Sequence, residues 1–342
     1  MKKRFILLLC CLLSFPVFAQ APSGWKISLA GDIMLGTDYP GNQLPANNGA
    51  GLLDATHTSF QWADIALANL EGALASGGKT GKVGCNKCYA FRTPPSFAKN
   101  FKDAGIDGFS QANNHAMDFG VSGLTQGARA LNAVGISSTG WQGSAPAVFD
   151  RNGKRACMLA FAPNRGMNDL RNIQNAQAMV ISAKKSCHLV IVSFHGGAEG
   201  SDKHVTPQGS ESYLGENRGN VRAFSRAMID AGAGLVFGHG PHIPRGMELY
   251  RGHLIAYSLG NFMTYGGISV TGNLGLAPLV MAQLDDSGRL ISGRIVSFRQ
   301  RVKSPIMRDG SHAAAKFMAS ATRRDFQGGK LRFTEDGGFY PE

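Results

Sequence analysis

The stretch "HLVIVSFHGG", residues 188–197, indicates the fold class of this chain. Its apolar run is typical of a strand buried on both faces, and it ends at His195, which two glycines follow. Other β-like runs also end in residues capable of chemistry. They are "WKISLAGD" (25–32), "ADIALANLE" (63–71), "IDGFSQANNH" (106–115), "GLVFGH" (234–239) and "LIAYSLGN" (254–261).

Helical patterns lie between these runs, with apolar residues at three- and four-residue spacing and a glycine at the end. Strand and helix therefore alternate, which predicts an α/β fold with much parallel sheet. In such sheets ligands gather at the carboxyl ends of the strands. The helical patterns are "PPSFAKNFKDAG" (94–105), "GLTQGARALNAVG" (123–135) and "NVRAFSRAMIDAG" (220–232).

The C-terminal part of the chain has a different pattern. Residues 279–302 contain two β-like runs around Asp285-Asp286-Ser287-Gly288 and predict a hairpin, and residues 311–326 predict a helix before a polar tail. We expect these elements to complete the sheet or cover its edge. The predicted organisation is a signal peptide at 1–19, the main domain at 24–300 and a C-terminal helical extension and tail at 301–342.

The N-terminus has the pattern of a cleavable secretory signal. Basic residues at 2–4 precede an apolar stretch, and small residues stand at Val17 and Ala19. We predict cleavage after Ala19 and a periplasmic or secreted protein. The apolar stretch is shorter than the about 20 residues of a membrane helix, and uncleaved anchoring is the alternative to its removal. After cleavage we expect no stable membrane span.

The chain is basic, with a formal net charge of +12. Removing the three basic residues of the predicted signal leaves +9. This charge favours attraction to anionic envelope polymers, phosphates or carboxylates. A generally soluble surface explains it equally well, because the basic residues form no long run. We do not expect nucleic acid as a partner of an exported protein.

Four cysteines remain after the predicted cleavage, in a compartment that permits disulfides. Cys85 and Cys88 in "GCNKCY" could close a small ring or bind zinc; we favour the disulfide because no second CxxC supplies the remaining zinc ligands. Cys157 and Cys187 each flank a strand-like run and are candidates for the other disulfide.

Taken singly, each polar strand end has an ordinary structural explanation, such as a turn with a capping aspartate at Asp32 or a satisfied buried histidine at His195. Together, carboxylates, an asparagine carbonyl and neutral imidazoles form a donor set that suits Mn, Fe, Zn or Co. Two such metals can polarise a phosphoryl oxygen and supply hydroxide. No serine nucleophile elbow, Walker loop or dinucleotide fingerprint is present.

Several motifs in one order resemble the CapA/PgsA family of poly-γ-glutamate capsule synthesis proteins, over about residues 27–262. The family is similar to the calcineurin-like metallophosphoesterases, which implies a four-layer α/β/β/α sandwich with mixed sheets. The motifs are "GDIMLG" (31–36), "ANLEG" (68–72), "QANNHAMDFG" (111–120), "VSFHGGAE" (192–199), "GHGPHIPRGMELY" (238–250) and "LIAYSLGNF" (254–262).

The resemblance also implies one or two divalent transition metals and a role for each residue of the set. His115 would face the substrate, where it donates a proton to the leaving group or stabilises developing charge. The implied metal ligands are Asp32 and His242 on the first metal, Glu71 as the bridge, and Asn114, His195 and His239 on the second metal.

The chain departs from the phosphoesterase pattern at Met34, where that pattern has a histidine. The first metal site therefore has one imidazole fewer than in that pattern. Arg165 and Arg245 are candidate anion-binding residues, because a guanidinium can hold phosphate or carboxylate through two hydrogen bonds. Surface ion pairs would explain both arginines equally well. Glu199 and Glu248 could orient histidines of the site.

The predicted function is that of an exported metal-dependent hydrolase, acting on an anionic envelope or capsular polymer or on a phosphoester. The alternative is a non-catalytic factor that binds a polyanion during capsule assembly or export, together with capsule-synthesis machinery. A protein whose metal is only a folding clamp is disfavoured, because structural sites are usually closed and often rich in cysteine.

Overall fold

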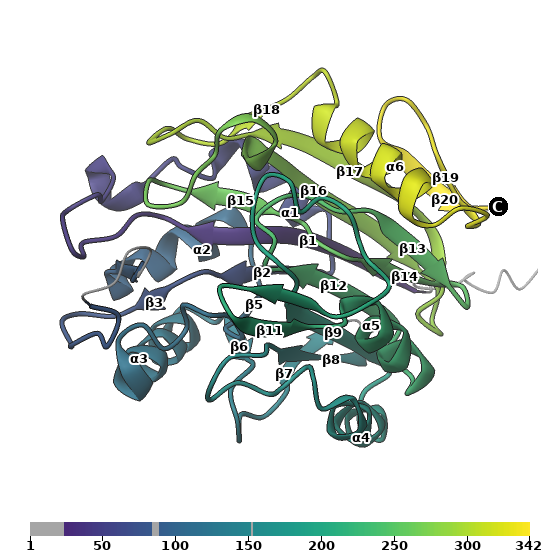
Figure 1. Ribbon diagram of the computed structural model, residues 1–342, viewed down its shortest axis with the longest axis horizontal. Coiled ribbons are helices and arrows are strands. Elements are labelled where there is room, and N and C mark those ends of the chain that lie inside the picture. Colours follow the sequence, from purple (N-terminus) through teal and green to yellow (C-terminus); the bar gives the residue numbers. More distant parts are fainter. Residues whose placement is uncertain (1–23, 84–88, 152) are drawn as a thin grey trace, which may run out of the picture.

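The computed structural model describes residues 24–83, 89–151 and 153–342, and it contains two large sheets (Figure 1). The predicted signal peptide and the pair Cys85 and Cys88 lie outside the described residues. The strands are β1 (Trp25–Met34), β2 (Ile65–Leu70), β3 (Ala73–Leu74), β4 (Arg92–Thr93), β5 (Gly108–Ser110), β6 (Ser137–Thr139), β7 (Ala147–Arg151), β8 (Lys154–Phe161), β9 (Leu189–His195), β10 (Glu211–Tyr213), β11 (Glu216–Gly219), β12 (Leu235–His239), β13 (Met247–Tyr250), β14 (His253–Ala256), β15 (Asn261–Thr264), β16 (Leu276–Leu284), β17 (Leu290–Arg299), β18 (Met307–Arg308), β19 (Leu331–Phe333) and β20 (Gly338–Pro341).

Helices α2, α3, α5 and α6 lie where the apolar periodicity predicts them, whereas α1 and α4 were not predicted. The three internal helical patterns correspond to α2, α3 and α5, and the C-terminal pattern corresponds to α6. The α-helices are α1 (His57–Gln61), α2 (Ala98–Ala104), α3 (Gly120–Ala133), α4 (Ile173–Lys184), α5 (Val221–Asp230) and α6 (Ala313–Asp325).

Both sheets combine parallel and antiparallel strands. The ten-stranded sheet runs β19-β20-β17-β16-β1-β2-β5-β6, with β15 beside β1 and β18 beside β17. The six-stranded sheet runs β13-β14-β12-β9-β8-β7. The strands β1, β2, β5 and β6 are parallel, as are β8, β9, β12 and β14. The sheets are therefore mixed, as the motif resemblance implied.

The four-layer sandwich is confirmed by how the apolar side chains divide. Residues such as Leu29, Ile191 and Phe237 form a core between the two sheets. The outer face of the ten-stranded sheet packs on α1, α2 and α3, and that of the six-stranded sheet packs on α4 and α5 (Figure 1). Each helix packs its apolar face on the face of a sheet. The strand ends lie at the edge of the sheet and can therefore carry polar groups.

The C-terminal segment is part of the sandwich. The predicted hairpin is present as β16 and β17, which pair from Leu276 to Arg299. Helix α6 packs on β16 and β17 and also on β13 of the other sheet. The expected polar tail contains β19 and β20, and β20 pairs with β17. The segment 301–342 therefore completes the edge of the ten-stranded sheet.

The predicted bridge between Cys157 and Cys187 is confirmed, with the two Cα atoms 5.9 Å apart. Cys157 lies in β8, whereas Cys187 lies in the turn before β9 and not in the strand itself. The bridge joins the end of the α4 region to the six-stranded sheet. Among the described residues, no helix combines the length and the apolar character that a membrane crossing requires.

Candidate metal centre

The carboxyl ends of strands from both sheets meet at one place. In the ten-stranded sheet, Asp32 of β1 lies opposite Asn69 of β2, and Glu71 follows β2 directly. In the six-stranded sheet, His195 and His239 end the neighbouring parallel strands β9 and β12 and lie opposite each other. Because the two sheets face each other, residues far apart in the chain, such as Asp32 and His195, come together.

The two carboxylates are held together by an amide. Asn69 Nδ2 donates to Asp32 Oδ1 at 2.9 Å and to Glu71 Oε2 at 2.6 Å. Asn113 holds Asn69 in turn, because its Nδ2 donates to Asn69 Oδ1 at 3.1 Å and to the Leu70 carbonyl at 2.7 Å. Asp32 and Glu71 are both fully buried, so this network offsets part of the cost of burying two carboxyl groups side by side.

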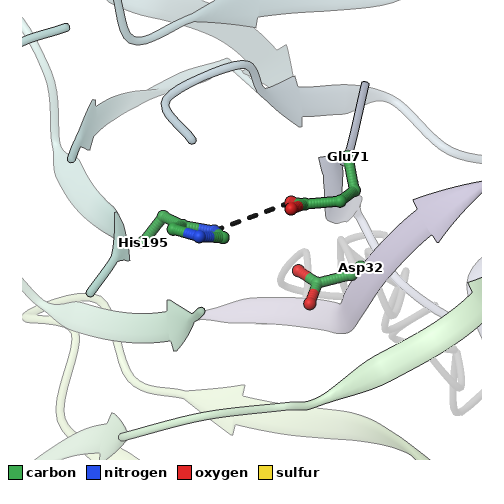
Figure 2. A group of neighbouring side chains, drawn as sticks. All are labelled: Asp32, Glu71 and His195. Carbon is green, nitrogen blue, oxygen red and sulfur yellow. Dashed lines mark ion pairs between the residues drawn. The ribbon is translucent and has the colours of Figure 1, made fainter. Parts of the chain in front are cut away.

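The strand-end histidines complete the cluster. Figure 2 shows His195 facing the two carboxylates, with its Nδ1 3.6 Å from Glu71 Oε2. His239 Nδ1 lies 3.7 Å from Asp32 Oδ1. Asp32, Glu71 and His195 each offer a ligand atom, and these atoms lie within 4.8 Å of one another.

These residues fit a divalent metal because several of their buried donor atoms have no hydrogen-bond partner among the described residues. Within the described residues, no ring nitrogen of His195 or His239 has a hydrogen-bond partner, although both rings are fully buried. Glu71 Oε1 and Asn114 Oδ1 are also buried without a hydrogen-bond partner there. Each such group costs roughly 1–3 kcal/mol unless something binds it. Mixed imidazole and carboxylate donors suit Mn, Fe, Zn or Co.

His242 reaches the cluster through an unusual backbone conformation. Its φ is +58°, in the left-handed region, and its Nδ1 lies 2.9 Å from Asp32 Oδ2. Gly240 permits the approach, because a Cβ there would lie 2.7 Å from the Gly196 carbonyl oxygen. Left-handed non-glycine residues often mark functional sites. On the other side of the ring, His242 Nε2 lies 3.8 Å from Glu199 Oε2.

Two residues that the sequence reasoning missed, Asp118 and Lys82, hold His115 and its loop. His115 Nδ1 lies 2.9 Å from Asp118 Oδ2, and its Nε2 lies 3.9 Å from Glu71 Oε1. Lys82 Nζ lies 2.5 Å from Asp118 Oδ1 and donates to the Asn114 carbonyl at 2.9 Å. The only available signal was Asp118 within "QANNHAMDFG", three positions after His115.

A small cavity of about 160 Å³, which we call the access cavity, opens beside the cluster. It is lined by Asn114 and His115, by Lys82, and by the rings of Tyr89 and Tyr213. Leu214, Arg218 and Glu199 complete the lining. Arg218 is 4% exposed, and its Nη1 has no hydrogen-bond partner among the described residues. Its Nη2 donates to Glu199 Oε1 at 2.8 Å.

The predicted anion-binding role of Arg245 is corrected by the structure. Its side chain is fully buried, and its Nη1 and Nη2 donate to the two oxygens of Glu211 at 2.8 and 2.7 Å. Its Nε donates to the Lys203 carbonyl at 2.7 Å. Because this internal ion pair occupies the guanidinium, Arg245 supports the loops beside the site. Arg165 is exposed and is not among the residues that line the cavity.

The two acidic residues expected to orient histidines have different positions. Glu199 lies between His242 and Arg218. Glu248 instead binds Arg226 and accepts from the Tyr257 hydroxyl at 2.7 Å, so it does not orient a histidine of the cluster. Met34, which stands where an imidazole was expected, is buried, and its sulfur accepts from Gly36 N at 3.2 Å.

Burial sets the protonation of the cluster. It lowers the pKa of His239 to about 4 and that of His195 well below its ordinary value, the latter with help from the charge of Arg218. Burial, then the charge of Asp32, raises the pKa of Glu71. Burial opposes charge on His242, but its hydrogen bond to Asp32 and the nearby carboxylates outweigh this and raise its pKa to about 10.

We therefore expect metal binding to release protons. His195 and His239 are neutral at pH 7 and ready to bind, whereas Glu71 and His242 hold protons that a metal displaces. Affinity should rise with pH up to about pH 10, the pKa of His242, by about tenfold per pH unit for each proton released, and the slope should fall once the pH passes the raised pKa of Glu71. Calorimetric titration in buffers of different ionisation enthalpy measures the protons released. A pH-independent affinity would contradict the assignment, and the variant His242→Gln should reduce the slope by about one proton.

Comparisons with known proteins agree with the motifs. The family model described as bacterial capsule synthesis protein PGA_cap matches residues 26–265. The PGA biosynthesis protein CapA of Bacillus subtilis (strain 168) is 26% identical over 302 residues, which are 82% of this chain and 74% of the relative. The capsule biosynthesis protein CapA of Bacillus anthracis is 28% identical over 215 residues, which are 56% of this chain and 48% of that protein. The chain thus spans about half the length of this second relative.

Among solved structures, the 5'-nucleotidase precursor from Thermus thermophilus has a TM-score of 0.44 and 12% sequence identity. The similarity covers 87% of this chain and 58% of that chain.

Proposed function

Since this chain belongs to the bacterial capsule synthesis protein family PGA_cap, we propose that it is an exported metal-dependent hydrolase of an anionic envelope or capsular polymer. A polymer of the poly-γ-glutamate type, or a phosphoester, would be its substrate. The observation that carries this proposal is the buried cluster of Asp32, Glu71, His195 and His239, whose ligand atoms largely lack protein partners. A binding surface without chemistry would not require this arrangement.

The chain's own residues have distinct roles in this proposal. Asp32, Glu71, Asn114, His195, His239 and His242 would hold one or two divalent metals. A bound metal supplies positive charge that polarises a substrate oxygen and lowers the pKa of water. His115 is the catalytic residue: Asp118 orients its ring, and its Nε2 points toward Glu71. Once the ring holds a second proton on Nε2, as an imidazolium that the Asp118 carboxylate stabilises, it can hand that proton to the leaving group and return to the neutral form.

The access cavity supports an anionic substrate. Arg218 lines it, and its Nη1 has no hydrogen-bond partner among the described residues, so Arg218 rather than Arg245 is the guanidinium able to bind an oxyanion. The names of the B. subtilis and B. anthracis relatives refer to PGA and capsule biosynthesis, which supports a polymer of that kind. The N-terminal signal pattern supports export to the periplasm or the medium.

Metal analysis followed by a substrate screen tests the proposal. The protein, purified from the exported fraction, should contain at least one equivalent of transition metal, and loaded protein should hydrolyse a phosphomonoester, a phosphodiester or a γ-glutamyl peptide. A chelator should abolish turnover, and added metal should restore it. A metal-free protein that retains its biological activity would overturn the proposal. A metal-loaded protein that binds polymer but hydrolyses none of the substrates would favour the assembly factor instead.

A further inference from the structure

A second cavity, of about 760 Å³, lies apart from the metal centre, and none of the candidate metal ligands lines it. This volume falls within the roughly 300–1,000 Å³ of ligand sites in proteins. Its walls come from α5, β13, the end of α6 and β19, which Figure 1 shows around the edge where α6 spans the two sheets. Five arginines line it: Arg222, Arg226, Arg323, Arg324 and Arg332.

The positive charge of this cavity exceeds its negative charge. Its lining contains only two acidic residues, Glu248 and Asp325. They pair with Arg226 and Arg324, and Arg332 pairs with Glu342 outside the lining. Within the described residues, Arg222 and Arg323 form no ion pair with a carboxylate.

Arg222 is held in place for a ligand. Its guanidinium lies 4.5 Å from the centre of the Phe326 ring, and its Nη2 donates to the Thr206 carbonyl at 2.5 Å. Its Nε is buried without a hydrogen-bond partner among the described residues. A guanidinium fixed in this way loses little further freedom when it binds an anion.

Helix stabilisation does not account for the whole cluster. Arg323 and Arg324 stand in the last turn of α6, where cations interact favourably with the helix dipole by about 0.3–1 kcal/mol. That effect does not extend to Arg222 of α5, and the ion pairs of Arg226 and Arg332 account for only part of the cluster that lines this space. Arginines from three separate elements converge on one cavity, which indicates a binding site.

We propose that this arginine-lined cavity binds a carboxylate-bearing polymer at a distance from the metal centre. The inference rests on the proposed polymer substrate and adds a second contact for it. Successive carboxylates of one chain would pair with different arginines, so the contacts reinforce one another. The site would hold the polymer while another segment of it reaches the access cavity beside His115.

Binding of poly-γ-glutamate to the full mature chain tests this site. The variant Arg323→Gln with Arg332→Gln removes two exposed charges of the cavity. We expect it to bind the polymer about tenfold more weakly than wild type at low salt, with a shallower salt dependence. The matched control is Arg129→Gln with Arg301→Gln, which removes two exposed arginines outside the cavity and should bind as wild type does.

Each outcome of this binding experiment either supports or overturns the proposed polymer site. Equal binding by the cavity variant and wild type, or an equal loss in the control, would overturn the site, as would a wild type that binds no poly-γ-glutamate. Stronger binding of inorganic polyphosphate would overturn the carboxylate assignment. Should the double variant fail to fold, Arg323→Gln alone tests the site, because this exposed residue forms no ion pair within the described chain. Metal content is measured in parallel, so a failure of the proposed hydrolase remains separate from a failure of this site.

Discussion

Replacing His239 with leucine should lower the affinity for divalent metal by roughly 100-fold or more while leaving the metal-free protein as stable as before or more stable. The imidazole is fully buried at the end of β12, 3.7 Å from Asp32 Oδ1. Neither of its nitrogens has a hydrogen-bond partner among the described residues. Leucine keeps most of the volume but removes the ligand.

The opposite signs of the two effects make this result specific to a metal ligand. Without metal, His239 keeps two unsatisfied polar atoms in the core, and removing them should raise the free energy of unfolding by about 1–3 kcal/mol. With metal, wild type gains stability in proportion to the logarithm of metal concentration over the dissociation constant, and the variant should lose that gain. Denaturant unfolding with and without metal measures both quantities.

The control for this variant is His57→Leu, because His57 is exposed in α1 and lies outside the cluster. Metal binding by this control should equal that of wild type. If His239→Leu destabilises the metal-free protein strongly, or retains wild-type metal affinity, then His239 is a structural core histidine.

The strand ends of the fold could be predicted from the sequence because their signal is local. An apolar run such as residues 189–194 marks a buried strand, and the polar residue that follows lies at its carboxyl end. The α/β alternation then places these ends at one edge of a sheet. The meeting of Asp32 and His195 depends on two different sheets facing each other, and the motif resemblance supplied that expectation.

The partners of the arginines could not be predicted, because they depend on loops that approach each other only in the folded chain. Arg245 follows the ligand motif closely and has the chemistry of an anion-binding residue, yet Glu211, 34 positions away, occupies its guanidinium. Arg218 has no motif of its own, and its free nitrogen is evident only from burial and geometry. Lys82 reaches Asp118 in the same way, across 36 positions of sequence.

Replacing Asp118 with asparagine should lower turnover by roughly 10²–10⁴-fold on whichever substrate the screen identifies, with metal content and KM close to wild type. Asp118 is buried, and its Oδ2 lies 2.9 Å from His115 Nδ1 and accepts from Phe91 N at 2.7 Å. As a carboxylate it fixes the proton of His115 on Nδ1, which leaves Nε2 directed toward Glu71. Asparagine has nearly the same shape, but its amide NH2 group is a donor in the place of one of the two carboxylate oxygens of Asp118, which are acceptors.

This role is that of a positioning residue, so the split between kinetic constants decides it. Loss of turnover with metal content and KM unchanged would show that the substitution acts through the orientation of the His115 ring. Asp118→Glu should recover part of the rate because it restores the carboxylate. The matched control is Asp103→Asn, which removes an exposed carboxylate whose one ion-pair partner in the described part of the chain is Lys99 of α2. If Asp118→Asn instead loses metal in proportion to activity, Asp118 acts through the loop that carries Asn114, and the orienting role assigned to it here is wrong.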